Sequence, residues 1–129
     1  PCATLGRACW WRLCCHHYPM RSELLPLIQS LRAFAAERDW AQFHNAKDLA
    51  LALNIEAGEL LEAFLWKSSE QADIEKVKEE LADVLAFAFL LAEKYDWDVK
   101  QIVLDKIEKN ALKYPVAKSK GSAKKYTEL

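Results

Sequence analysis

The sequence of 129 residues has little glycine, little proline and no long hydrophobic run. Three glycines and four prolines leave most of the chain without turn signals, which argues against a sheet with many tight turns and favours long helices. The longest uninterrupted apolar run, from Val84 to Ala92, is too short to span a bilayer. The net charge of −1 argues against a general attraction to nucleic acid polymers or to anionic membranes. We therefore expect a helical protein with neither of these partners.

Cysteine occurs only within the first fifteen residues, in a segment that shares no pattern with the rest of the chain. The run from Cys14 to His17 has the composition of a zinc cluster, but its ligands are too crowded for the usual spacing. We predict that residues 1–20 are an N-terminal extension, either upstream or foreign to the natural protein, with Met20 as a candidate natural start. A genuine N-terminal arm that packs on the domain is the alternative. A domain without cysteine fits a reducing compartment, and we expect the protein in the cytoplasm.

Hydrophobic periodicity predicts four helices within a domain over residues 21–117, followed by a basic C-terminal tail over residues 118–129. The helices are expected from about Ser22 to Arg38, Ala46 to Trp66, Asp73 to Lys94 and Val99 to Lys113. Asn45 is the predicted N-cap of the second helix, and the Tyr114-Pro115 pair ends the fourth. The connections are short enough for antiparallel neighbours. The predicted fold class is therefore all-α, a four-helix bundle.

The third predicted helix is apolar around its whole circumference between Val84 and Ala92. One layer of four helices does not easily cover that much apolar surface. We therefore expect the bundle to assemble as a homo-oligomer.

Two acidic pairs interrupt the apolar stripes of the second and third predicted helices. In the second helix Glu56 occupies a step of the stripe, and Glu59 follows three residues later on the same side. In the third helix Glu80 occupies such a step, and Asp83 follows it. Four carboxylates buried near one another without a cation would be very unfavourable. The two pairs therefore predict a divalent metal ion held between two helices.

A solvated acidic face is the simpler interpretation of any single pair of this kind. Two pairs that both interrupt an apolar stripe weaken that interpretation. The outer faces of the same helices already have charges of their own, among them Lys67, Lys76 and Lys94. The pairs are therefore not needed for solubility.

The candidate ligands all offer oxygen atoms, which favours Mg²⁺, with Mn²⁺ as a substitute. Di-iron bundles use histidine from a Glu-x-x-His motif. The histidines of this chain are His16, His17 and His44, and none lies within either acidic helix. The metal is therefore expected to serve phosphate chemistry, in which Mg²⁺ binds a few carboxylates together with substrate phosphates.

Polar and aromatic side chains suited to a nucleotide lie outside the acidic helices. Lys106 and Asn110 share a face of the fourth predicted helix, and Tyr114 follows one turn later. Such a row can hold phosphate oxygens, although a solvated lysine beside a capping asparagine is the simpler alternative. Trp40 and Trp66 lie at loop edges, where they can stack on a nucleobase or merely pack.

Taken together, these segments resemble the MazG-like all-α nucleoside triphosphate pyrophosphohydrolases, with the strongest likeness to the dCTP pyrophosphatases. The resemblance covers about Leu24 to Leu129. The segments that carry it are Trp40–His44 (WAQFH), Ile55–Trp66 (IEAGELLEAFLW), Glu79–Val84 (EELADV), Lys106–Pro115 (KIEKNALKYP) and Lys125–Leu129 (KYTEL).

The resemblance implies a homo-oligomer, a dimer or a tetramer with the tetramer favoured, and active sites at subunit interfaces. It implies Mg²⁺-dependent cleavage of a dNTP, dCTP or a modified pyrimidine dNTP, to dNMP and pyrophosphate in nucleotide-pool house-cleaning. The implied metal ligands are Glu56, Glu59, Glu80 and Asp83. The implied phosphate ligands are Lys106, Asn110 and Tyr114. The implied base and sugar pocket contains Trp40, His44, Trp66 and Phe87.

A carboxylate is expected to take the proton of the attacking water, and both Glu59 and Glu62 are candidates for this base. Phe87 stands where a tyrosine is expected near the sugar, and the link between the second and third helices is shorter than in the animal dCTP pyrophosphatases. The alternative function is a non-catalytic helical oligomerisation or regulatory module that retains a structural metal site. A carboxylate-bridged oxidase is disfavoured because the acidic helices lack histidine.

Overall fold

The computed structural model describes residues 24–128, and every regular element in that range is helical. This confirms the predicted all-α class. The elements are α1 (Leu25–Glu37), η1 (Trp40–Phe43), α2 (Ala46–Glu62), η2 (Ser69–Gln71), α3 (Ile74–Lys94), α4 (Val99–Lys113), α5 (Val116–Ser119) and η3 (Tyr126–Glu128). The predicted N-terminal extension lies outside the described residues. In the part of the chain that the structure describes, no helix is long and apolar enough to cross a membrane.

Three of the long helices begin at a side chain that accepts a hydrogen bond from the first turn. The Oδ1 of Asn45 accepts from the backbone N–H of Asp48 at 3.0 Å, which confirms Asn45 as the N-cap of α2. Asp73 caps α3 in the same way. Asp98 caps α4, whose observed bounds are the predicted ones. Local capping chemistry therefore fixes these helix starts.

The predicted end of the second helix was wrong. The α2 helix ends at Glu62, and Ala63 to Trp66 form a tight turn instead of a further helical turn. In this turn the hydrogen bonds shorten to three residues, as in the bond from the Phe64 N–H to the Leu61 carbonyl at 3.0 Å. Trp66 then takes a left-handed backbone conformation with a φ of 59°, which an α-helix cannot continue.

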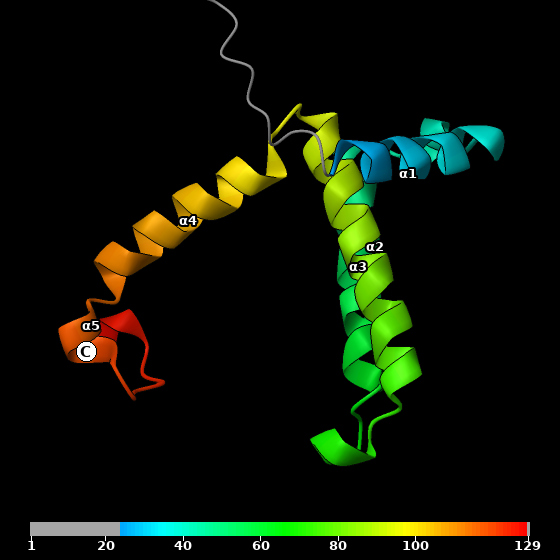
Figure 1. Ribbon diagram of the computed structural model, residues 1–129. Helices are drawn as coiled ribbons and strands as arrows, with labels where there is room; N and C mark the ends of the chain where they lie inside the picture. The colour runs from blue at the N-terminus through cyan, green and yellow to red at the C-terminus, as the bar shows by residue number, and fades with distance from the viewer. Residues whose placement is uncertain (1–23, 129) are drawn as a thin grey trace, which may run out of the picture.

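The α2 and α3 helices lie side by side and run antiparallel, while α1 crosses their upper end (Figure 1). The α4 helix leads away from this pair, so one chain does not close a four-helix bundle. Leu49 on α2 is 2% exposed, and the other buried apolar residues are alanines. The packed interior of the described chain is therefore small.

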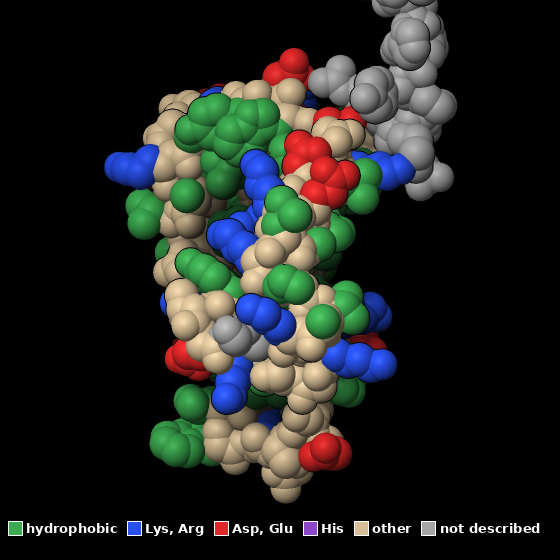
Figure 2. Space-filling model, turned by 90° about the vertical axis from the view of Figure 1, so that its left-hand side faces the viewer, with side chains coloured by type: hydrophobic (Ala, Val, Ile, Leu, Met, Phe, Trp, Pro, Cys, Tyr) green, Lys and Arg blue, Asp and Glu red, His purple; other side chains and the backbone are tan. Residues whose placement is uncertain are grey.

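Large apolar side chains lie exposed along α4, a helix without a single buried residue. They are Ile102, Val103, Leu104, Ile107 and Leu112. On the face that carries α4 and the tail, apolar side chains lie among those of lysine and arginine (Figure 2). An apolar face of this kind marks an interaction surface more often than an ordinary solvated one.

The tail after Tyr114 folds back on the end of α4. The rings of Tyr114 and Tyr126 meet edge to face with centroids 6.0 Å apart, and the Nζ of Lys113 lies 5.2 Å from the Tyr126 ring centre. Ser119 Oγ donates to the backbone carbonyl of Pro115 at 2.9 Å. The predicted stop at Tyr114-Pro115 is confirmed, and the short helix α5, which periodicity did not predict, follows it.

Candidate metal and nucleotide site

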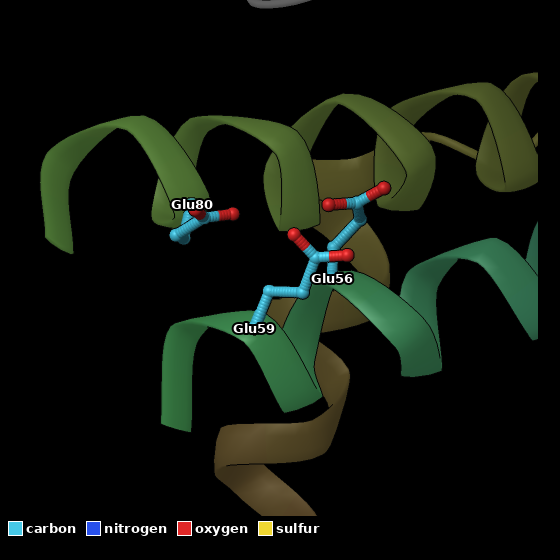
Figure 3. A group of neighbouring side chains, drawn as sticks. All are labelled: Glu56, Glu59 and Glu80. Atoms are coloured by element: carbon cyan, nitrogen blue, oxygen red, sulfur yellow. The ribbon is translucent and has the colours of Figure 1, made fainter. Parts of the chain in front are cut away.

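Three of the predicted metal ligands converge between the two packed helices. Glu56 and Glu59 come from α2 and Glu80 comes from α3, and one carboxylate oxygen of each lies within 4.8 Å of the others. Figure 3 shows the three side chains in the space between the helices. Glu56 and Glu80 are half-buried, whereas Glu59 is exposed. Antiparallel packing therefore joins the two acidic pairs into one cluster.

The carboxyl group of Glu56 has its pKa raised above the ordinary value. The first cause is partial burial, and the negative charges of Glu59, Asp83 and Glu80 add to it. The field of the cluster therefore favours a proton on Glu56, whereas a bound cation would neutralise the same field and favour the ionised carboxylate. Carboxylate oxygens at this separation are donors of the kind that Mg²⁺ and Mn²⁺ prefer. The donor set thus fits a hard divalent cation.

The fourth predicted ligand, Asp83, lies at the edge of the cluster. It is exposed and stands outside the group of three converging carboxylates, but it is close enough for its charge to act on Glu56. Glu62, the second candidate for the general base, is exposed at the last residue of α2. The geometry therefore gives three converging ligands and one neighbouring carboxylate.

Two of the predicted pocket residues, Trp40 and His44, precede α2 in the chain. Trp40 stands in η1, and its indole meets the Phe34 ring edge to face with centroids 5.8 Å apart. His44, directly after η1, lines a cavity of about 380 Å³ together with Leu49 and Leu90. The cavity lies where α1, η1, α2 and α3 meet, and it is large enough for part of a small ligand.

The other two pocket residues differ sharply in exposure. The Trp66 side chain is 94% exposed, and it projects from the left-handed turn after α2. Phe87 is half-buried on α3. A fully exposed indole on a strained backbone is unfavourable in an isolated chain, and strain of this kind clusters at functional sites. Trp66 therefore has surface available for a ligand or a second subunit.

The predicted phosphate ligands lie on α4 and directly after its end, apart from the acidic cluster. Lys106 is exposed, whereas Asn110 and Tyr114 are half-buried. Asn110 accepts the Tyr114 N–H through its backbone carbonyl at 2.8 Å. Because α4 leads away from α2 and α3, the three phosphate ligands lie apart in space from the carboxylates of the same chain (Figure 1).

Two features around Trp40 and His44 were not predicted from the sequence. The guanidinium carbon of Arg38 lies 3.6 Å from the centre of the Phe34 ring, beside Trp40. Arg32 and Glu93, which pair at 3.1 Å, line the same cavity as His44. The spacing of Phe34 and Arg38, four residues apart on a helix, was the available signal for the first feature. The ion pair between Arg32 and Glu93 joins α1 to α3, and no local sequence pattern predicts it.

Comparison with known proteins gives one consistent result. The MazG-like family matches residues 51–129 of the chain. The chain is 42% identical to dCTP pyrophosphatase 1 of Mus musculus over 123 residues, which cover 86% of this chain and 72% of that protein. It is 39% identical to dCTP pyrophosphatase 1 of Homo sapiens over 116 residues, which cover 81% of this chain and 68% of that protein.

A solved structure gives the same answer for the fold. The crystal structure of a pyrophosphatase from Archaeoglobus fulgidus is similar with a TM-score of 0.66 and 36% sequence identity, over 78% of this chain and 95% of that one. Enzymes of one reaction class therefore match over most of the chain, which supports an enzyme over a non-catalytic module. The chain belongs to the MazG-like family and is a nucleotide pyrophosphatase, a hydrolase of nucleoside triphosphates.

Proposed function

We propose that the protein hydrolyses a deoxynucleoside triphosphate, dCTP or a modified pyrimidine dNTP first, to the monophosphate and pyrophosphate. This reaction would remove unwanted nucleotides from the cytoplasmic pool. The observation that carries the proposal is the convergence of Glu56, Glu59 and Glu80 between α2 and α3. Its support is the likeness to proteins named dCTP pyrophosphatase 1 in mouse and man.

The carboxylate cluster is proposed to hold Mg²⁺, with Mn²⁺ as a substitute. Glu56, Glu59 and Glu80 supply the converging oxygens, and Asp83 completes the set from the next turn of α3. When bound, the ion supplies positive charge against the triphosphate oxygens and the four carboxylates. The all-oxygen donors and the acidic field at Glu56 support this assignment.

The proton of the attacking water is proposed to pass to a carboxylate on α2. Water attacks phosphorus at the anhydride that joins the α- and β-phosphates, a bond forms to the water oxygen, and the bond to the bridging oxygen breaks. Glu59 and Glu62 are both exposed at the end of α2, within reach of bulk water. Either one can accept the proton as general base.

The active enzyme is proposed to be a homo-oligomer, a tetramer rather than a dimer. The exposed apolar face of α4 needs a partner, and α4 leads away from the carboxylates of its own chain. Assembly would bring Lys106, Asn110 and Tyr114 of one subunit to the carboxylates of a neighbouring one. A cation, an amide and a phenol could then hold the phosphate oxygens that the metal leaves free.

The base and sugar are proposed to lie among four side chains, Trp40, His44, Trp66 and Phe87. The large exposed areas of the two indoles supply surfaces for stacking. Stacking tolerates any base, so the discrimination must come from a polar group at the ring edge, and His44 is the candidate.

One experiment tests the proposal directly. Purified protein is given dCTP, 5-methyl-dCTP, dTTP, dUTP, dATP and dGTP with Mg²⁺, and pyrophosphate release is measured as kcat/KM. We expect dCTP or its modified form to be the best substrate and the purine nucleotides to be poor ones. Inorganic phosphate as the product, or equal rates for purines and dCTP, would contradict the proposal. A chelator control without Mg²⁺ should give no turnover.

A further inference from the structure

Trp40 is held by contacts that reach back to the last turn of α1. The Phe34 ring meets the indole edge to face, with a centroid distance of 5.8 Å and an angle of 74° between the planes. Arg38 lies over the Phe34 ring at 3.6 Å from its centre. The guanidinium thus lies over the phenyl ring, and the indole meets the same ring edge to face, so the three side chains form one cluster.

The guanidinium of this cluster is itself fixed. Arg38 Nη1 donates to the backbone carbonyl of Phe34 at 3.0 Å and contacts the carboxylate of Glu37 at 3.5 Å. These contacts hold the guanidinium in one place over the ring. Cation–π attraction is strongest when the cation stays close to the ring face, as it does here.

The turn between α1 and η1 places Trp40 against Phe34. Asp39 has a left-handed backbone with a φ of 54°, and its N–H donates to the Ala36 carbonyl at 3.0 Å. The amide of Gln42 donates to the Asp39 carbonyl at 2.9 Å and to its Oδ2 at 2.8 Å. Aspartate tolerates this conformation better than most residues, and the amide bonds hold it. The chain therefore reverses directly before Trp40 and returns the indole to α1.

Packing of a hydrophobic core does not account for this cluster. The Phe34 side chain is 50% exposed and the Trp40 side chain is 46% exposed. An exposed aromatic pair buries little surface, but it restricts the rotation of both rings. A side chain that is already held in its binding orientation loses less conformational freedom when a ligand stacks on it.

We propose that Phe34 and Arg38 are positioning residues that set the plane of the Trp40 indole for stacking on the nucleobase. The inference rests on the proposed function, in which Trp40 belongs to the base pocket. It assigns base affinity to Phe34 of α1 and to Arg38 directly after that helix, neither of which needs to touch the nucleotide. The phosphate and metal side of the site does not depend on them.

The test compares a ligand that has a base with one that has none. Binding of α,β-imido-dCTP and of inorganic triphosphate is measured calorimetrically with Mg²⁺ for wild type, Phe34→Leu and the matched control Phe34→Tyr. Phe34→Leu should weaken binding of the dCTP analogue about three- to tenfold, which corresponds to the usual energy of an aromatic pair. It should change the binding of triphosphate by less than about twofold. Phe34→Tyr keeps the ring and should bind both ligands like wild type.

Two further variants show whether the effect passes through Trp40. In a Trp40→Ala background, Phe34→Leu should cause no additional loss, because the side chain that it positions is gone. Arg38→Gln keeps both rings and should weaken binding of the dCTP analogue about two- to fivefold. Binding of inorganic triphosphate should again change little. This variant also carries the test if Phe34→Leu fails to fold, which thermal unfolding would show.

The outcomes separate this inference from the proposed function. Equal loss of both ligands would mean a merely structural role and would overturn the inference, as would unchanged binding of the analogue or full additivity with Trp40→Ala. Each of these results leaves the proposed function intact as long as wild type releases pyrophosphate from dCTP. A wild type that neither binds the analogue nor hydrolyses dCTP would overturn both.

Discussion

Glu56 on α2 and Glu80 on α3 bring carboxylate oxygens within 4.8 Å of each other, although they lie on separate helices. Both side chains are half-buried, and each occupies a place in the apolar stripe of its helix. Like charges in such a place destabilise the pair unless a proton or a cation intervenes. The contact between these two residues is therefore the structural basis of the proposed metal site.

The first prediction concerns the ligands of the metal. Glu56→Gln and Asp83→Asn should each abolish hydrolysis while the fold stays intact, because each removes a charge that the cation needs. Without metal, Glu56→Gln should unfold at a higher temperature than wild type, since it relieves the repulsion among the carboxylates. Pyrophosphate release and thermal unfolding measure the two effects.

The matched control for the ligand variants is Glu79→Gln, which removes an exposed carboxylate next to Glu80 in the sequence. Glu79 stands outside the converging group, so this variant should keep normal turnover. Turnover like that of wild type in Glu56→Gln or Asp83→Asn at saturating Mg²⁺ would contradict the four-carboxylate site.

The second prediction concerns pH. The pKa of Glu56 is raised in the folded chain, chiefly by burial, so the native state holds its proton more tightly than the unfolded state does. In the window above the ordinary glutamate pKa of about 4.3, the metal-free protein should therefore lose stability as the pH rises. Denaturant unfolding at several pH values, with chelator present, should show this slope in wild type and a flatter one in Glu56→Gln. Saturating Mg²⁺ should reverse the loss at neutral pH.

The third prediction concerns Trp66. If its exposed indole stacks on the base, Trp66→Ala should weaken dCTP binding by about 1–3 kcal/mol, the usual worth of such stacking. The affinity for Mg²⁺ should barely change, because the indole lies beyond the end of the helix that carries Glu56 and Glu59. The measurement is kcat/KM for dCTP together with a metal titration. Unchanged kinetics would assign Trp66 to subunit packing instead.

The fourth prediction concerns assembly. The chain has a mass of 14.8 kDa, and its exposed apolar face on α4 should hold it in an oligomer, a tetramer rather than a dimer. Light scattering at micromolar concentration should return a multiple of the chain mass. A charge placed on the face, as in Ile107→Lys, should shift the population toward monomer and lower activity together. A wild type that scatters as a monomer would contradict the prediction.

The fifth prediction concerns sites shared between subunits. Glu56→Gln and Lys106→Ala should each be inactive alone, the first through the metal and the second through the phosphates. When the two proteins are unfolded together and refolded, mixed oligomers should regain part of the activity, because some sites then receive both intact residues. Refolding each variant separately is the control. No recovery on mixing would mean that each chain supplies its own Lys106.

Local patterns predicted the helices well wherever capping chemistry decides their bounds. Asn45 and Asp98 cap their own helices through bonds to residues three positions away, and these caps account for the starts of α2 and α4. The end of α4 followed from the Tyr114-Pro115 pair. The end of α2 did not follow. The segment up to Trp66 keeps an apolar pattern, but its hydrogen bonds shorten to three residues and the backbone of Trp66 is left-handed. No glycine or proline in the segment from Ala63 to Trp66 indicates this turn.

The sequence alone determined the all-α class, the starts of α2, α3 and α4 to within one residue, and the acidic pairs, because each depends on residues within a few positions of one another. The first helix begins at Leu25, later than the predicted start at Ser22. Tertiary structure decided the rest. Only the antiparallel packing of α2 on α3 shows that Glu80 joins Glu56 and Glu59 while Asp83 stays at the edge. Only the fold shows that α4 leaves the pair and that Phe34 meets Trp40 across a reversed turn. These relationships depend on helix directions, which hydrophobic periodicity does not encode.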